Sequence, residues 1–351
     1  MLISDFDFEL PEELIAQHPP ARRDASRMLV VNRRESVWRD GSFAQLPELL
    51  REGDALVINN TRVFPARLVG RREPTGGRVE LLLVRRIEDA AQPHTWEVLA
   101  RPARRLEEGA RLSFGGGRLA AEVVRHAADG RRVVRFQPAG DFDALLEAFG
   151  QVPLPPYIRR ETDAPTSAED RARYQTVYAG RSGAIAAPTA GLHFTPRVLE
   201  ELRRRGVRVA EVTLHVGYGT FAPVRVEDLS GHSVAPEAFE VTEEAADVIN
   251  SARAAGGRVV AVGTTSVRTL ESTADERGRI HAGSGETSLT ITPGWRFRAV
   301  DALLTNFHLP RSSLLVLVAA FAGRELTLAA YAHAVAARYR FYSYGDCMLI
   351  D

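Results

Sequence analysis

The stretch Val259-Val260-Ala261-Val262-Gly263-Thr264-Thr265-Ser266-Val267-Arg268 decides the fold class of this chain. Its four aliphatic residues predict a short buried strand, and the glycine after them leads at once into three hydroxyl side chains and the start of a helix. Strands that alternate with helices in this way are typical of α/β proteins. The first N–H groups of such a helix, together with the three hydroxyls, suit an anion or a carboxylate, and an ordinary helix cap explains the same residues equally well.

The segments on either side extend the α/β pattern. Strands are predicted at residues 55–58 and 207–216, and helices at residues 43–51, 243–255 and 314–322. The last of these helices is apolar on all sides, which predicts that it is buried inside the protein. We therefore expect a layered α/β body.

Residues 62–138 have a different sequence pattern. Short β-rich runs follow one another here, separated by turns that contain glycine, and no long helix is predicted between them. This spacing predicts a small antiparallel β-barrel, or a sandwich, inserted into the α/β body. The expected domains are a discontinuous body of residues 1–61 and 139–351 and an inserted β-barrel of residues 62–138.

Charge separates the same two regions. The insert has 16 arginines against 9 acidic residues, whereas the whole chain has 45 basic and 45 acidic residues. A basic module in an acidic body suits contact with RNA, and the solvated surface of strands and turns explains the excess as well. The neutrality of the whole chain argues against a protein that coats nucleic acid without specificity.

Composition excludes several kinds of chemistry. All the basic residues are arginine, so no lysine is available for a Schiff base or for a phosphate-binding loop. The single cysteine, Cys347, excludes a disulfide within the chain and a cysteine-rich metal site. The N-terminus is acidic and lacks the features of a secretion signal, and the longest apolar run, residues 314–322, is too short to span a bilayer. We expect a cytoplasmic protein.

Three histidines stand where a ligand would be expected. His193 follows a stretch of small residues, His215 lies between a strand and a glycine, and His308 lies between a strand and a proline. Because ligands of open α/β sheets bind at the carboxyl ends of the strands, we expect these histidines to gather in one crevice. For each of them taken alone, a histidine packed in the core is the alternative.

Eight irregular motifs run in order from one end of the chain to the other. They are Asp5-Phe6-Asp7-Phe8-Glu9-Leu10-Pro11, Asn59-Asn60-Thr61-Arg62-Val63, Pro153-Leu154-Pro155-Pro156-Tyr157-Ile158, Ala187-Pro188-Thr189-Ala190-Gly191-Leu192-His193-Phe194, His215-Val216-Gly217, Gly263-Thr264-Thr265-Ser266-Val267-Arg268, Thr305-Asn306-Phe307-His308-Leu309-Pro310 and Tyr344-Gly345-Asp346. Together they resemble the S-adenosylmethionine:tRNA ribosyltransferase-isomerase family. One stretch departs from the His-x-Met-His-x-Glu pattern of that family: His232 and Glu237 are present, but Val234 and Ala235 replace the methionine and the second histidine.

The resemblance implies a reaction and its partners. Members of the family transfer the ribosyl part of S-adenosylmethionine to 7-aminomethyl-7-deazaguanine at the wobble position of tRNA and isomerise it. The products are epoxyqueuosine in the tRNA, adenine and methionine. The implied partners are tRNA and S-adenosylmethionine, which serves as cosubstrate, and no membrane. No metal or redox cofactor is implied, because the sulfonium itself supplies the activation, and we expect a monomer.

The implied chemistry needs groups that move protons and groups that hold the cosubstrate. A histidine or a carboxylate can take a proton from the carbon next to the sulfonium or assist the departure of adenine. We expect the catalytic groups among His193, His215, His308, Asp301 and Asp346. We expect the cosubstrate to be held by Gly263, Thr264, Thr265, Ser266 and Arg268, and we expect no metal site.

Two other classes of protein stay open on the residues alone. A methyltransferase that uses S-adenosylmethionine to modify RNA would also be an α/β protein, but its opening strand would lead into a Gly-x-Gly-x-Gly loop, which this chain lacks. Such an enzyme would move the methyl group to RNA. An RNA-binding protein without enzymatic activity would leave S-adenosylmethionine intact.

Overall fold

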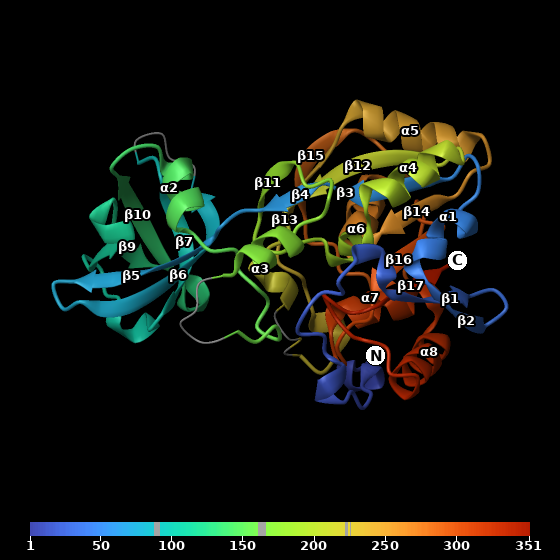
Figure 1. Cartoon of the computed structure of the whole chain (residues 1–351), viewed down its shortest axis with the longest axis horizontal. Helices are drawn as coiled ribbons and strands as arrows, with labels where there is room; N and C mark the ends of the chain where they lie inside the picture. The colour runs from blue at the N-terminus through green and yellow to red at the C-terminus, as the bar shows by residue number, and fades with distance from the viewer. Residues whose placement is uncertain (88–91, 161–165, 222–223, 225) are drawn as a thin grey trace. The chain divides into compact units, whose positions relative to one another are not determined.

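The computed structural model describes residues 1–87, 92–160, 166–221, 224 and 226–351 (Figure 1). Within these residues the chain forms two compact units. The first contains residues 1–62, 155–159 and 173–351, and the second contains residues 63–154 and 160–172.

The described part of the first unit is built on a nine-stranded sheet. In spatial order its strands are β15 (Gly283–Thr287), β13 (Glu237–Val241), β12 (Arg208–Leu214), β3 (Ala55–Asn59), β14 (Val259–Val262), β16 (Ala302–Asn306), β17 (Cys347–Ile350), β1 (Arg27–Asn32) and β2 (Val37–Ser42). The central strands β12, β3, β14 and β16 are parallel to one another, whereas β17 is antiparallel to β16 and parallel to β1. Four strand ends and two strand beginnings therefore meet at one edge of the sheet, which we call the carboxyl edge.

Helices cover both faces of this sheet, as its sequence requires. Every residue of β3, β14, β16 and β17 is buried, and such continuous burial is typical of strands that are covered on two sides. Alternate residues enter different cores: Val57 and Ala261 belong to one cluster, and Leu56 and Val260 to the other. The predicted layered α/β body is thus confirmed.

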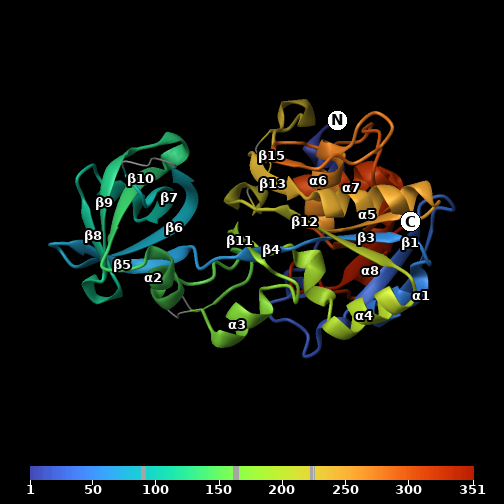
Figure 2. The same ribbon diagram turned by 90° about the horizontal axis from the view of Figure 1, so that it is seen from above.

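The helices divide between the two clusters. The first cluster contains residues of α5 (Glu243–Ala254), α6 (Gly263–Thr273), α7 (Ser313–Ala322) and α8 (Arg324–Ala336). The second contains residues of α1 (Leu46–Leu49) and α4 (Pro196–Arg204), which lie on the opposite side of β3 from α5 and α6 (Figure 2). Among the described residues no single helix is long and apolar enough to cross a membrane, and only α7 and α8 taken together, bent by 116°, pass such a test.

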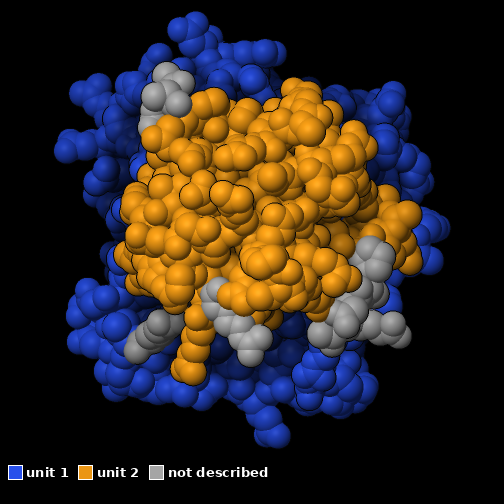
Figure 3. All heavy atoms as spheres, turned by 90° about the vertical axis from the view of Figure 1, so that its left-hand side faces the viewer, with its two compact units in different colours: residues 1–62, 155–159, 173–351 blue, residues 63–154, 160–172 orange. Residues whose placement is uncertain are grey.

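The second unit, orange in Figure 3, contains a closed antiparallel barrel of six strands within its described residues. In spatial order they are β10 (Arg132–Pro138), β7 (Thr95–Arg101), β6 (Gly77–Ile87), β5 (Arg67–Glu73), β8 (Arg111–Phe114) and β9 (Leu119–His126). Alternating buried residues of these strands fill the barrel, together with Phe142 of α2 (Phe142–Phe149). The antiparallel β-barrel predicted from the sequence is confirmed.

The chain enters the barrel through a short separate strand. β4 (Thr61–Val63) pairs with β11 (Arg181–Ala184), and β5 begins only at Arg67. Pro65 lies between the two strands and has no N–H to donate to a ladder, which explains the interruption. Among the described residues the remaining α-helix is α3 (Ala168–Arg173).

Candidate active site

The carboxyl edge brings together residues that lie far apart in the sequence. β3 ends at Asn59, β14 is followed by Gly263, and β16 ends at Asn306. Asn306 is the partner of Cys347 in the first position of β17, so Asp346 also reaches this edge. We expect polar residues at the ends of parallel strands to lie close together. The structure brings Gly263, Asn306 and His308 together at this edge.

A pocket opens at this edge, with about 510 Å³ of empty space, part of it open to solvent. The pocket is lined by Tyr157, Ala187, Pro188, Thr189, Ala190, Val216, Gly263, Thr264, Thr265, Thr305, Asn306, His308, Leu314, Tyr342 and Ser343. Among the described residues that line it, none carries an acidic or a guanidinium side chain, so the pocket is polar but uncharged.

Gly263 allows strand β14 to pass into helix α6 without a loop. Its φ of +85° lies in the left-handed region, which glycine adopts at little cost. No side-chain hydrogen bond caps the helix at Val262. The first N–H groups of α6 therefore face the pocket side without partners inside the helix, next to the hydroxyls of Thr264 and Thr265.

The hydroxyls of α6 are not all available to a ligand. Ser266 donates to the carbonyl oxygen of Val262 at 2.8 Å, within its own helix. Thr265 accepts a hydrogen bond from the Asn59 side chain at 3.2 Å and still lines the pocket. The structure thus brings Gly263, Thr264 and Thr265 to the pocket but leaves Ser266 behind it.

His308 lines the pocket and is held from two sides. Its Nε2 lies 2.9 Å from the Thr305 hydroxyl, and its backbone N–H donates to the Tyr331 hydroxyl at 3.0 Å. Burial lowers the pKa of His308 to about 3, because the charged imidazolium would lose its hydration. At neutral pH the ring is therefore uncharged and available as a hydrogen-bonding group.

His193 lies behind the pocket, at the end of the 3-10 turn Thr189–His193. Its Nε2 accepts a hydrogen bond from the Asn306 amide at 3.1 Å, so its Nδ1 carries the proton and donates to the Ser26 hydroxyl at 2.8 Å. Burial, assisted by the charges of Arg23 and Arg340, lowers its pKa to about 3. His193 contacts the pocket through Asn306 and is not among the lining residues.

His215 follows the end of β12, immediately before the lining residue Val216. Its Nδ1 lies 2.8 Å from the Thr61 hydroxyl, and its ring packs on Gly183, where a Cβ would come within 2.7 Å of the imidazole. Partial burial lowers the pKa of His215, while the charge of Glu240 opposes the shift. Of the three predicted histidines it is the most accessible.

Arg268 is engaged outside the pocket. The buried guanidinium forms an ion pair with the buried Glu237 and donates to the carbonyl oxygens of Leu289 at 3.0 Å and Thr287 at 3.1 Å. Glu237 in turn accepts the backbone N–H of Gly217 at 2.8 Å. This ion pair ties β13 to α6, so the structure does not bring Arg268 together with the expected cosubstrate-holding residues.

A smaller pocket lies beside Arg268. His232, Val234 and Leu314 line it, and Leu314 also lines the pocket at the carboxyl edge. Val234, which departs from the family pattern, donates its backbone N–H to the Thr290 hydroxyl at 3.1 Å. The departure thus lies next to the candidate site but outside its lining.

Asp346 reaches the carboxyl edge but is occupied by the backbone. Its two carboxylate oxygens accept the N–H groups of Arg27 and Arg340, each at 2.8 Å. Burial raises the pKa of Asp346, although these two hydrogen bonds and the two guanidinium charges oppose the shift. The carboxylate joins the beginning of β1 to the loop before β17, and it does not line the pocket.

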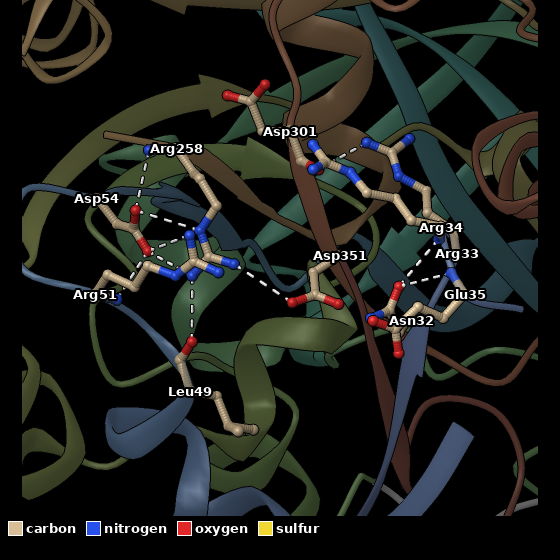
Figure 4. A network of polar contacts seen from close by, with 10 residues as sticks. All are labelled: Asn32, Arg33, Arg34, Glu35, Leu49, Arg51, Asp54, Arg258, Asp301 and Asp351. Carbon is tan, nitrogen blue, oxygen red and sulfur yellow. Dashed lines mark hydrogen bonds and ion pairs between the residues drawn. The ribbon is translucent and has the colours of Figure 1, made fainter. Parts of the chain in front are cut away.

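Asp301 does not belong to this site, and that expectation has to be corrected. It precedes β16 and therefore lies at the opposite edge of the sheet, which we call the amino edge (Figure 4). Its carboxylate accepts the N–H of Val259 at 2.8 Å, and its carbonyl oxygen accepts from Arg33 at 2.9 Å. The prediction placed Asp301 near β16 without distinguishing the start of that strand from its end, and only the end lies at the carboxyl edge.

Several lining residues were not among the predicted site residues. Asn306 ends a strand that is otherwise dominated by apolar side chains, and this signal was readable in the sequence. Tyr157, Tyr342 and Ser343 come from irregular segments; Tyr157 stands in one of the eight motifs, whereas no local pattern of the sequence marks Tyr342 and Ser343.

Known proteins resemble the chain over its whole length. A family model described as "Queuosine biosynthesis protein" matches residues 3–350. The S-adenosylmethionine:tRNA ribosyltransferase-isomerases of Symbiobacterium thermophilum and Syntrophotalea carbinolica are each 53% identical to it over 350 residues, which is 100% of this chain and of each relative. The crystal structure of the S-adenosylmethionine tRNA ribosyltransferase from Thermotoga maritima covers 99% of this chain and 100% of its own, with a TM-score of 0.56 and 38% identity. By these matches the chain belongs to the queuosine biosynthesis protein family, that of the S-adenosylmethionine:tRNA ribosyltransferase-isomerases.

Proposed function

We propose that this chain transfers the ribosyl part of S-adenosylmethionine to 7-aminomethyl-7-deazaguanine at the wobble position of tRNA and isomerises it. The products are epoxyqueuosine in the tRNA, adenine and methionine. The observation that carries the proposal is the 53% identity, over 100% of this chain and of each relative, to proteins named for this activity. An uncharged pocket at the carboxyl edge of an α/β sheet supports it, since that edge is where such sheets bind ligands.

The three histidines in and beside the pocket differ in how readily they can accept a proton. With pKa values of about 3, His193 and His308 are weak bases, so we propose that they position other groups through hydrogen bonds. His215 is only half-buried and is the better candidate to accept the proton next to the sulfonium.

We also propose that no cofactor takes part beyond the cosubstrate. The positive sulfur makes the neighbouring carbon acidic and the ribose transferable, so activation is already present in the substrate. Dialysis against a strong metal chelator should leave the transfer rate unchanged. A loss of activity that returns with one added divalent metal would contradict this proposal.

The chain is further proposed to act as a monomer in the cytoplasm. Sedimentation of the active enzyme at assay concentration tests the first point, since a sedimentation coefficient of a dimer would contradict it.

The function is tested by following the parts of S-adenosylmethionine separately. The enzyme is incubated with tRNA that carries the aminomethyl base, and the nucleosides are analysed by mass spectrometry. Isotope label in the adenosyl ribose should enter the tRNA, while methyl label stays on methionine and adenine label is released. Methyl label in the tRNA would identify a methyltransferase, and intact S-adenosylmethionine beside bound tRNA would identify a binding protein.

A further inference from the structure

Asn306 has a buried hydrogen-bond acceptor that nothing in the described structure satisfies. The residue is 2% exposed, and its Oδ1 has no partner among the described residues. An unmatched buried acceptor is unfavourable, and native proteins keep few of them. Those that remain call for a specific explanation, such as a ligand that supplies the missing donor.

The orientation of the Asn306 amide is fixed by its other end. Its Nδ2 donates to the carbonyl oxygen of Tyr342 at 3.1 Å and to Nε2 of His193 at 3.1 Å. A carbonyl oxygen can only accept, so the nitrogen must stand on this side. The oxygen is the part of the amide left for the pocket that Asn306 lines.

Asn59 shows what a purely structural asparagine looks like at the same edge. It too is buried at the end of a central strand, but both ends of its amide are used. Its Oδ1 accepts the N–H groups of Thr61 and Leu214, each at 3.1 Å, and its Nδ2 donates to the carbonyl oxygen of Leu214 at 3.0 Å. The unmatched oxygen is therefore particular to Asn306 and is not a general feature of these strand ends.

The rest of the pocket defines what the missing donor belongs to. The first N–H groups of α6 offer donors to an acceptor on the ligand, beside the acceptor that Asn306 offers to a donor. The described lining residues include no carboxylate that would balance an ammonium group and no arginine that would balance an anion. Small apolar side chains, such as Ala187, Ala190 and Val216, make up much of the remaining wall. An uncharged flat heterocycle with a donor and an acceptor on one edge fits these conditions.

We propose that this pocket binds the adenine of S-adenosylmethionine, with Oδ1 of Asn306 accepting a hydrogen bond from the 6-amino group. A ring nitrogen next to that amino group accepts from the first N–H groups of α6. This assignment rests on the proposed function, which makes S-adenosylmethionine a substrate. The methionine part and the aminomethyl base both carry an ammonium group, and this pocket offers neither of them an opposite charge.

The proposal makes a prediction about ligand selectivity. Adenosine should bind more tightly than purine riboside, which has hydrogen in place of the 6-amino group, by on the order of 10- to 100-fold. Inosine should bind no better than purine riboside, because its 6-oxygen would face the oxygen of Asn306. Calorimetry or competition with S-adenosylmethionine measures all three affinities on the unchanged protein.

Two variants assign the selectivity to the residue. In Asn306→Ala the preference for adenosine over purine riboside should collapse to about 1-fold, because the acceptor is gone. Asn59→Ala is the matched control, since it removes a buried asparagine from the end of β3, which β14 separates from β16, and should keep the full preference. If Asn306→Ala does not fold, the three affinities of the unchanged protein still decide the matter.

Equal binding of adenosine and purine riboside to the unchanged protein would overturn the proposal. So would a preference that survives in Asn306→Ala. Transfer of the labelled ribose to tRNA is measured in the same preparation: transfer without selectivity rejects the adenine assignment alone, whereas absent transfer rejects the proposed function.

Discussion

The two edges of the central sheet use polar residues in opposite ways. At the amino edge, Asp54 and Arg258 form a charged cluster with Asp351, and each charge lies against another charge or against the backbone (Figure 4). At the carboxyl edge the pocket is lined by hydroxyls, an imidazole and an amide, without a charged side chain among the described lining residues. The charged groups of the cluster at the amino edge have partners within the protein. At the carboxyl edge, the first N–H groups of α6 and Oδ1 of Asn306 have no such hydrogen-bond partners among the described residues.

The pKa values express the same contrast. Burial alone would raise the pKa of Asp54, but hydrogen bonds from Arg258 and from the backbone N–H groups of Arg51 and Arg258 outweigh it and lower the pKa. At the carboxyl edge, burial keeps His193 and His308 uncharged, with pKa values of about 3. The charged side chains that form the cluster at the amino edge are therefore paired (Figure 4), whereas the groups that line the pocket are neutral. Charged groups near that pocket, such as Asp346 and the pair Arg268–Glu237, lie outside its lining.

The largest expected effect is a loss of turnover when the histidines at the carboxyl edge are replaced. Of His193→Ala, His215→Ala and His308→Ala, at least one should lower the single-turnover rate on the order of a hundred- to ten-thousand-fold, the usual range for a proton-handling group. His215→Ala is expected to show the greatest loss. His281→Ala, an exposed histidine that pairs with Asp275, is the control and should leave the rate unchanged.

Rates and thermal melts are measured together on these four variants. A residue that acts on the substrate lowers the rate of folded enzyme, whereas a residue that only packs lowers the melting temperature. If all three variants lose activity in proportion to the folded fraction, the histidines are packing residues and the shared site is wrong.

The second effect concerns the stability of the amino edge. Asp54→Asn removes the buried partner of an ion pair with the partly buried Arg258, whose Nη2 lies 2.7 Å from Oδ2, and the loss should be below the roughly 3–5 kcal/mol that is typical of a fully buried pair. Urea unfolding should show this loss, while the turnover of the folded fraction stays at the level of the unchanged enzyme. Lowered turnover at full stability would give the amino edge a functional role and would erase the contrast.

A third effect appears on acidification. A histidine with a pKa of about 3 in the folded protein, against about 6.5 when unfolded, takes up its proton only after unfolding in the interval between these values. Stability is therefore lost as pH falls from about 6.5 towards 3, by about 2 kcal/mol per histidine at pH 5. Unfolding curves at pH 7 and pH 5 should show a smaller loss for His193→Gln and His308→Gln than for the unchanged protein. Equal losses in all three proteins would mean that these rings are not buried in their neutral form.

The smallest effect extends the comparison to the barrel, whose arginines differ in how they are used. Arg132 is buried and donates to the carbonyl oxygens of Leu106 and Ala103, so it is structural. Arg104 and Arg111 are exposed and suit phosphates. Replacing both by Gln should weaken tRNA binding several-fold and reduce the salt dependence by roughly one unit of slope per lost phosphate contact. Unaltered tRNA affinity would mean that these two arginines do not contact tRNA and that the α/β unit is the place to look for the RNA-binding surface.

Much of the fold could be predicted because the local pattern and the tertiary environment agree. β3 contains the strand predicted at residues 55–58 and extends it by one residue, and α5 begins at residue 243, where its helix was predicted to begin. β17 was missed because its four residues, Cys347–Ile350, are too short to show a period. The edge strand β15 and its neighbour β13 were missed, since the first is rich in Gly, Ser and Glu, the second contains two Glu, and both owe their form to pairing with their neighbours.

Residues of the site could be predicted from the sequence only where the parallel order of the strands determines their position. Gly263 and His308 follow parallel strands, so their meeting at one edge followed from the fold class. Arg268 and Asp346 stand in equally suggestive motifs, but Arg268 faces Glu237 and Asp346 faces backbone N–H groups. Which partner a buried charge finds depends on contacts across the fold, and no local pattern specifies them.

Hydrogen exchange with and without S-adenosylmethionine tests the central claim most directly. The first N–H groups of α6 have no acceptor within the helix, so they report on a ligand that binds them. We predict that S-adenosylmethionine slows exchange at residues 263–266 and 306–308 and leaves residues 54, 258 and 301 unchanged. Protection at the amino edge, with no change at residues 263–266, would contradict the account.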